Sequence, residues 1–192
     1  RVEFVGPQIG DELREQGGLA MLLSLFLVML YVAFRFQFKF AVGSVVALVH
    51  DVILTLGFFS VTGMEFNLNV LAAVLTIIGY SINDTIVIFD RIRENFRKLR
   101  RATPVEVVNI SLTETLERTI ATAGTVFLTV LALAVFGGDM LFGFAAAMLV
   151  GVIAGTYSSV YMAAATTLML GVTKEDLMLP VKEGADQNDL TP

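Results

Sequence analysis

The chain of 192 residues contains no cysteine, no tryptophan and a single histidine. The lack of cysteine excludes disulfides and thiolate metal sites, and one histidine excludes a histidine-rich metal site. Charge is also scarce, because charged residues make up 16% of the chain and hydrophobic residues 56%. A soluble domain of this length needs more charge to cover its surface. The composition therefore predicts an integral membrane protein.

Hydrophobic runs divide the chain into five segments that are long enough to cross a bilayer. A spanning helix needs about 20 mostly apolar residues for a hydrocarbon core of about 30 Å. The sequence thus predicts an all-α bundle of five transmembrane helices, together forming a membrane domain at residues 18–172. The predicted spans are residues 18–36, 40–61, 68–89, 119–136 and 140–170. The last is long for one span, so it should tilt or protrude into water.

The loops between these spans differ in their positive charge. Arg35 and Lys39 separate the first two spans, and six arginines and lysines lie between residues 91 and 101. The connections at residues 63–65 and 137–139 contain neither. Because Lys and Arg mark cytoplasmic loops, residues 1–17 are predicted to be extracytoplasmic and the C-terminus cytoplasmic. Residues 173–192 contain too little apolar surface for a core, and we expect a disordered tail.

The basic loop contains a helix start. Thr103, Pro104 and Glu106 match an N-cap, a first-turn proline and the acid of a capping box. Apolar residues follow at helical spacing at positions 105, 108, 112 and 116. We expect an amphipathic helix at about residues 104–117 that lies at the cytoplasmic interface and leads into the fourth span. A plain loop is the alternative.

Small residues recur at every fourth position of the fifth span. Such stripes allow the backbones of membrane helices to approach closely. The stripe is therefore expected to be a helix-packing face, against either its own bundle or a partner protein. Its members are Gly143, Ala147, Gly151, Gly155, Ser159, Ala163, Thr167 and Gly171.

Asp84 lies inside the third predicted span, next to Asn83. At 1.5 Å per residue it is roughly 9 Å inward from Asp90 at the cytoplasmic edge. Its side chain is too short to reach water, and a charge at that depth costs about 2.5 to 3.5 kcal/mol. Asp84 is therefore a candidate for taking up and releasing a proton. The alternative is a permanently protonated residue that holds helices together by hydrogen bonds.

His50 and Asp51 lie about ten residues into the second span, near mid-bilayer at about 15 Å. Adjacent residues on a helix project about 100° apart, so only one of the two is expected to line a polar path. Histidine titrates near physiological pH. The alternative for His50 is a neutral, hydrogen-bonded core residue.

Arg118 begins the fourth span. It can be an ordinary snorkelling arginine, or its long side chain can reach the depth of Asp84. An Asp–Arg pair there would resemble a proton switch, and Thr122, one turn further in, would extend the polar track. Asp90, Arg91 and Arg93 are most simply an anchor at the interface.

Five motifs resemble the SecF family, the smaller subunit of the bacterial SecDF protein-export complex. They are VGPQIGDEL at 5–13, ALVHDVILTLG at 47–57, GYSINDTIVIFDRIREN at 79–95, TLERTIATAG at 115–124 and GTYSSVYMAAA at 155–165. They cover nearly the whole chain in the family's order. The resemblance implies a six-span subunit with an extracytoplasmic domain, of which this chain would lack the first span and most of the domain.

The resemblance also implies a function. SecF-like proteins pair with SecD in a resistance–nodulation–division-type membrane core of the bacterial inner membrane. They use the proton-motive force, with no bound cofactor, to help the SecYEG channel draw preproteins across. The family's intramembrane acid corresponds to Asp84, its arginine to Arg118 and, less specifically, a polar position to Thr122. No enzymatic activity and no nucleic-acid partner are expected; the partners are SecD, SecYEG, a preprotein and the lipid bilayer.

Three other functions remain to be weighed. The chain could be mainly a structural and docking subunit, with SecD conducting the protons. A small-molecule efflux pump is disfavoured because the short outer loops leave no room for a drug-binding domain. An intramembrane aspartyl protease is disfavoured because its second acid would be Asp51 and no GxGD run is present.

Overall fold

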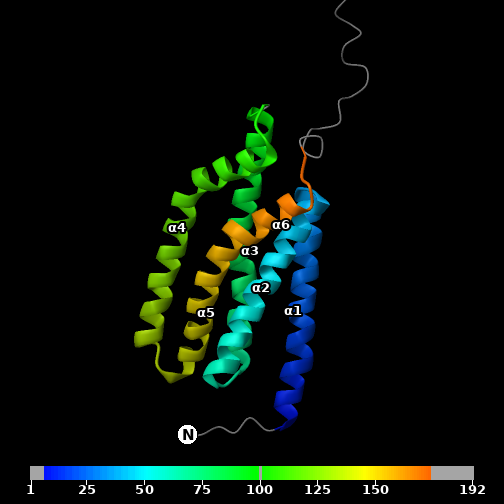
Figure 1. The fold of residues 1–192 in the computed structure, drawn as a ribbon. Coiled ribbons are helices and arrows are strands. Elements are labelled where there is room, and N and C mark those ends of the chain that lie inside the picture. Colours follow the sequence, from blue (N-terminus) through cyan, green and yellow to red (C-terminus); the bar gives the residue numbers. More distant parts are fainter. Residues whose placement is uncertain (1–6, 100, 174–192) are drawn as a thin grey trace, which may run out of the picture.

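The computed structural model describes residues 7–99 and 101–173, and these form an all-helical bundle (Figure 1). The elements are α1 (Pro7–Arg35), α2 (Phe38–Thr62), α3 (Leu68–Lys98), α4 (Pro104–Phe136), α5 (Asp139–Tyr157), the π turn η1 (Ser158–Met162) and α6 (Ala163–Met169). Within the described part, five helical stretches are long and apolar enough to cross a membrane, counting α5, η1 and α6 as one. The five-helix prediction is therefore confirmed. The predicted tail, apart from Thr173, lies outside the described residues.

The helices stop where the backbone turns at glycine or where a side chain caps the next helix. Gly63 ends α2 in the left-handed region, with φ of 66°. Asn67 then caps α3, its side-chain oxygen accepting a hydrogen bond from the Val70 amide at 3.1 Å. The capping box predicted for Thr103 and Glu106 is confirmed. The Glu106 carboxylate accepts from the Thr103 amide at 2.8 Å, and the Glu106 amide donates to the Thr103 hydroxyl at 3.3 Å.

The helix that starts at Thr103 does not end where the interfacial helix was expected to end. Residues 104–117 are the first part of α4, which continues to Phe136. After Pro104 the helix contains no further proline, and its one glycine, Gly124, does not interrupt it. Its first turns pack on the C-terminal end of α3, burying Val107 and Val108. The Asn95 amide of α3 donates to Ser111 at 3.0 Å and to Glu114 at 2.8 Å.

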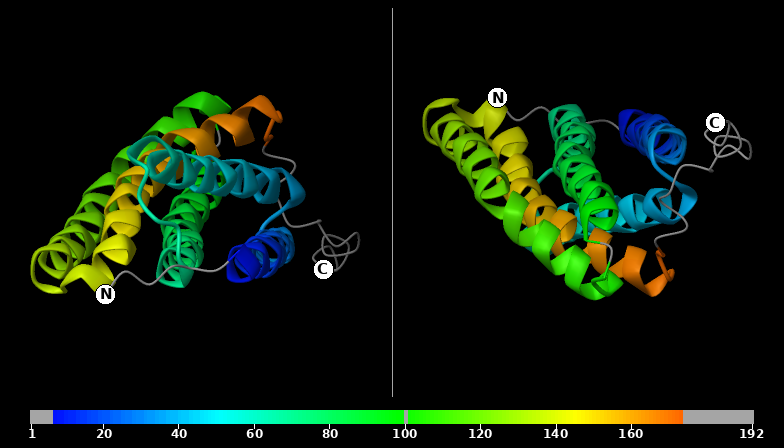
Figure 2. Two further views of the ribbon diagram at one scale, coloured as in Figure 1. Left: turned by 90° about the horizontal axis from the view of Figure 1, so that it is seen from below. Right: turned by 90° about the horizontal axis from the view of Figure 1, so that it is seen from above.

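Two apolar clusters hold the bundle together, one toward each end. At the end where α1 stops, the rings of Phe40 and Phe89 meet edge to face with centroids 4.7 Å apart. At the opposite end Phe59, Val70 and Met148 pack together. Seen end-on, α1 and α4 lie at opposite edges of the bundle, and α3 contacts α1, α2, α4 and α5 (Figure 2). The helix carrying Asp84 is thus the one around which the others are arranged.

The fifth span is not a regular helix throughout. Between α5 and α6, residues 158–162 form one π turn, η1, and the chain then returns to α-helix. Such turns arise where one extra residue is inserted into a helix, and they often lie at functional sites. Here Ser158 and Ser159, at the start of the turn, are fully buried.

Candidate functional site

Asp84 is buried on α3, at 3% exposure, in the layer between α3 and α4. Among the described residues, its Oδ2 atom has no hydrogen-bond partner, and neither has the nearby Tyr80 hydroxyl. Thr122 of α4 faces both groups, but its hydroxyl donates to the carbonyls of Arg118 and Thr119, each at 3.0 Å. A buried polar atom without a partner is costly. Asp84 Oδ2 can therefore still accept a hydrogen bond or bind a proton.

Arg118 lies one turn before Thr122 on α4 and is exposed. Its charge acts on Asp84, yet none of the ion pairs within 4.0 Å among the described residues joins the two. The structure therefore holds Arg118 near the acid without direct contact.

Asn83 points elsewhere. It is exposed on α3, on the same face as Ala72, Thr76 and Gly79. The spacing of these four positions places them along one side of the helix. This face of α3 consists of small and polar residues, and no described helix covers it.

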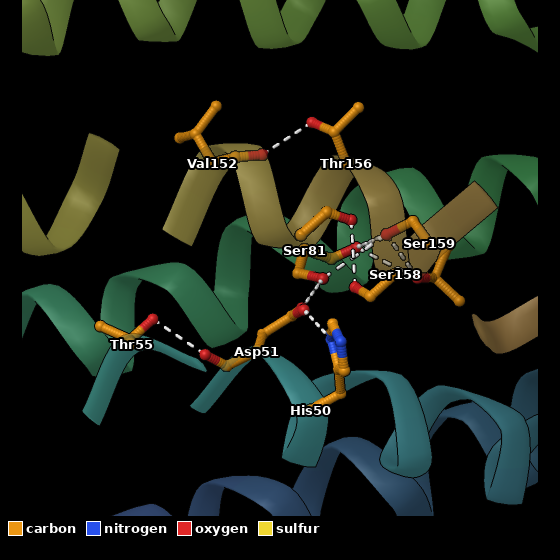
Figure 3. Close-up of polar contacts among 10 residues, drawn as sticks. His50, Asp51, Thr55, Ser81, Val152, Thr156, Ser158 and Ser159 are labelled. Carbon is orange, nitrogen blue, oxygen red and sulfur yellow. Dashed lines mark hydrogen bonds and ion pairs between the residues drawn. The ribbon is translucent and has the colours of Figure 1, made fainter. Parts of the chain in front are cut away.

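Asp51 is the second buried carboxyl group, and its exposure is 0%. Ser81 of α3 donates a hydrogen bond to Oδ2 at 2.7 Å, and His50 Nδ1 lies 3.3 Å from Oδ1 (Figure 3). Ser158 of η1 also faces the carboxyl group. His50 and Asp51 do project differently, as expected, since 24% of the His50 side chain is exposed. They nevertheless contact each other.

A chain of hydroxyl groups leads away from Asp51 into the π turn. Ser81 Oγ lies 3.5 Å from Ser159 Oγ. Ser159 donates to the Ser81 carbonyl at 3.2 Å and accepts from Thr85 at 3.0 Å (Figure 3). Sequence reasoning missed Ser81, Thr85 and Ser158, and it identified Ser159 only as a packing residue. The adjacent serines in GTYSSVYM were the available signal, since paired hydroxyls in an apolar span need partners.

The small-residue stripe of the fifth span lies mostly inside the chain's own bundle. Ala147, Gly151, Gly155 and Ser159 are buried, whereas Gly143 is half-buried. A Cβ added to Gly155 would lie 3.3 Å from Ser81 Oγ and 3.6 Å from Asp51 Oδ2. The absence of a side chain at Gly155 is therefore what brings α5 close to the Asp51 cluster.

At the predicted cytoplasmic end, charged residues form ion pairs. Arg35 of α1 bonds Asp90 of α3 at 3.1 and 3.2 Å. Arg91 and Lys98 both contact Glu94, at 3.0 and 2.6 Å. These pairs tie the ends of the helices together, in keeping with an anchoring role. Among the described residues, no group of three His, Cys, Asp or Glu side chains could hold a metal ion.

Comparison with known proteins shows the family to which this chain belongs. The family model described as "Protein export membrane protein SecD/SecF, C-terminal" matches residues 1–173. The chain belongs to this family. Curated relatives named protein translocase subunit SecF are 54% identical in Vibrio alginolyticus over 99% of the chain, 59% in Pseudomonas aeruginosa over 94%, and 49% in Escherichia coli O157:H7 over 100%. The resemblance to SecF is thus confirmed.

Solved structures agree with the fold. The crystal structure of SecDF from Thermus thermophilus, described as a translocon-associated membrane protein, matches 86% of this chain with a TM-score of 0.81 and 49% identity. A SecDF structure in a super-membrane-facing form matches 86% of the chain with a TM-score of 0.78 and 45% identity. These matches cover 23% and 22% of those chains. The chain spans about 61%, 59% and 60% of the three curated relatives.

Proposed function

We propose that this SecF-family chain is the membrane part of a proton-coupled subunit that assists Sec-dependent protein translocation. It would work with SecD and the SecYEG channel in the bacterial inner membrane, with its C-terminus in the cytoplasm. The observation that carries the proposal is the Asp84 carboxyl, which is buried in a spanning helix and whose Oδ2 has no partner among the described residues. Ionisable residues inside a membrane bundle are expensive and typically mark proton or ion pathways.

Asp84 and Arg118 would act as a switch. A charged Asp84 attracts the Arg118 guanidinium strongly, because the surroundings have a low dielectric constant. Once Asp84 takes up a proton, that attraction ends and Arg118 can return toward the surface, where it lies in this structure. Thr122 and Asn83 would supply polar positions along the route. His50 and Asp51 would extend it on the other side of α3.

SecD would supply the remaining wall of the path. The α3 face with Thr76, Gly79 and Asn83 is exposed beside the Asp84 layer, and small residues allow a second helix to approach closely. No enzymatic step and no cofactor enter the proposal, since the proton gradient would supply the energy. The substrate would be an unfolded preprotein.

A mainly structural role is the second candidate, and two observations favour it. Asp84 and Arg118 form no ion pair within 4.0 Å, and the small-residue stripe gives the fifth span extensive close packing. In that case SecD would conduct the protons. This chain would hold the complex together.

Asp84→Asn, studied in the full-length protein with SecD in inverted membrane vesicles, tests the proposal. We expect loss of the part of preprotein export that depends on the proton gradient, because the amide has the same shape and cannot carry the proton. Asp90→Asn is the matched control, since it removes an acid of the same helix that is paired with Arg35 at the surface. Export with normal proton dependence in Asp84→Asn would sink the proposal.

The yield of assembled complex is measured in the same vesicles. A normal yield with lost proton dependence supports the switch. A reduced yield with normal proton dependence for each complex that forms supports the structural role instead. Arg118→Ala is expected to behave like Asp84→Asn under the first alternative.

A further inference from the structure

A buried acid whose neighbours can hydrogen-bond only its charged form, or only its neutral form, stays in that form and has a structural role. Asp51 differs, because its neighbours can serve either state. As a carboxylate it accepts from Ser81 at Oδ2 and from His50 Nδ1–H at Oδ1, over 2.7 and 3.3 Å. As an acid its Oδ1–H can donate to an unprotonated Nδ1, while Ser81 still donates to Oδ2. Both states therefore have their hydrogen bonds without any movement of heavy atoms.

We propose that Asp51 and His50 form a second proton-binding site, separate from Asp84 and loaded through the histidine. Only His50 in the cluster keeps part of its surface exposed, at 24% of its side chain, whereas Asp51 is at 0%. A proton that reaches the exposed edge of His50 binds imidazole Nε2, and the Nδ1 proton passes to Asp51 Oδ1. The step leaves a neutral imidazole with hydrogen on Nε2 and a neutral carboxylic acid. One proton has entered and none is lost.

Apart from His50, the groups that face Asp51 are hydroxyls, which carry no charge. From α3 it faces the hydroxyl of Ser81, and from η1 that of Ser158. Thr85 and Ser159 lie one step further away and bond each other. The tyrosine ring next to His50, that of Tyr157, contacts the imidazole with centroids 6.2 Å apart.

Other titratable groups on the packed helices have neighbours of their own. Tyr161 of η1 packs on Tyr157, with ring centroids 5.1 Å apart. Asp84 and Tyr80 of α3 face Thr122 on α4. On α1, Arg35 is paired with Asp90, and Tyr31 is exposed. The described residues of α6 include no titratable side chain.

Loading this site weakens the connection between α2 and the π turn. A hydrogen bond to a carboxylate is roughly twice as strong as one between neutral groups, so Ser81 holds Asp51 less tightly after protonation. Ser81 is the residue that also contacts Ser159 through its hydroxyl and its carbonyl. The proton at Asp51 thus weakens the hydrogen bond that joins α2 to the α3–η1 pair, next to the π turn.

The site is tested by infrared spectroscopy of the full-length complex in lipid nanodiscs, at constant salt, as the pH is varied. Asp84→Asn is compared with the double variant Asp84→Asn/Asp51→Asn. We expect the single variant to keep a buried-carboxyl band that grows as the pH falls and that the double variant lacks. A difference between the two that does not change with pH would mean that Asp51 is permanently protonated or permanently charged, and would overturn the proposal.

Ser81→Ala provides a second readout that retains the acid. Removing the donor at 2.7 Å should move the Asp51 band to higher frequency, because a carbonyl without its hydrogen bond is stiffer. Thr76→Ala on the same helix is the control, since Thr76 is exposed and donates to the Ala72 carbonyl of its own helix. An unmoved band in Ser81→Ala would overturn the geometry. A band removed by added sodium at fixed pH would also overturn it, by assigning the cluster to a metal cation.

The proposal rests on the proposed function for its role in export, but the band is measured without transport. If Asp84→Asn exports normally while the Asp51 band titrates, the proposed function fails and this site stands. If Asp84→Asn loses proton-dependent export while the Asp51 band does not change with pH, the proposed function stands and this site fails.

Discussion

Gly151 occupies a position on α5 where there is no room for a side chain. A Cβ there would run into the side chain of Ile77, which is itself 1% exposed. Gly151→Ala is therefore expected to destabilise the folded subunit by about 1 to 3 kcal/mol, the usual range for overpacking a core. The measurement is the thermal unfolding midpoint of the protein in nanodiscs.

Gly124→Ala is the matched control for this change. Gly124 is also a glycine inside a spanning helix, but nothing lies within 4 Å of the position of its Cβ. Alanine there should leave stability unchanged or raise it by up to about 1 kcal/mol. Ile77→Val combined with Gly151→Ala should recover part of the loss. A Gly151→Ala variant as stable as Gly124→Ala would show that the two helices are further apart.

At the scale of single residues, the sequence identifies the buried acids but not the residues that bond them. Asp51 and Asp84 stand out because a carboxyl group is rare in an apolar run. Ser81 and Thr85 do not stand out, since a hydroxyl in a membrane helix can be satisfied by the carbonyl four residues back, as in Thr76. Whether such a hydroxyl also bonds a neighbouring helix depends on how the helices are rotated, and no local pattern determines that.

The start of α4 depends on its capping box. Thr103→Val removes the side-chain acceptor for the Glu106 amide and should cost about 1 kcal/mol. The loss should be local, seen as faster hydrogen exchange of the amides at residues 105–107. Thr113→Val is the control, because this exposed threonine of α4 donates to the Asn109 carbonyl within its own helix. Equal exchange in both variants would show that packing on α3 alone holds these turns.

Spans and caps of this kind are readable from sequence because they depend on neighbouring residues. Thr103, Pro104 and Glu106 encode a helix start whatever they pack against. The π turn at Ser158–Met162 has no such code, since no proline or glycine lies within it. Ser159 in this turn contacts Ser81 and Thr85, which are 78 and 74 residues away in the sequence. An element fixed by distant contacts cannot be predicted from its own residues.

At the scale of the whole molecule, one face of α3 is left open by the described helices at the depth of the site. Along α3, Ala72, Thr76, Gly79 and Asn83 are exposed, and no atom of the described residues lies within 4 Å of the Cβ position of Gly79. Under the proposed function this is where a SecD helix packs. Gly79→Leu should then reduce co-purification with SecD at least tenfold, about 1.4 kcal/mol, because the larger side chain keeps the second backbone away.

Gly57→Leu is the matched control, since Gly57 is an exposed helical glycine of α2 with equally open space. It should leave association unchanged if α2 faces lipid there. Both variants should unfold at the same temperature when the full-length subunit is produced without SecD, because neither side chain meets a described residue. If Gly79→Leu instead destabilises the subunit alone, then another part of the same full-length protein covers this face. SecD would then have to dock elsewhere, and Asp84 would lose the second wall that the proton path requires.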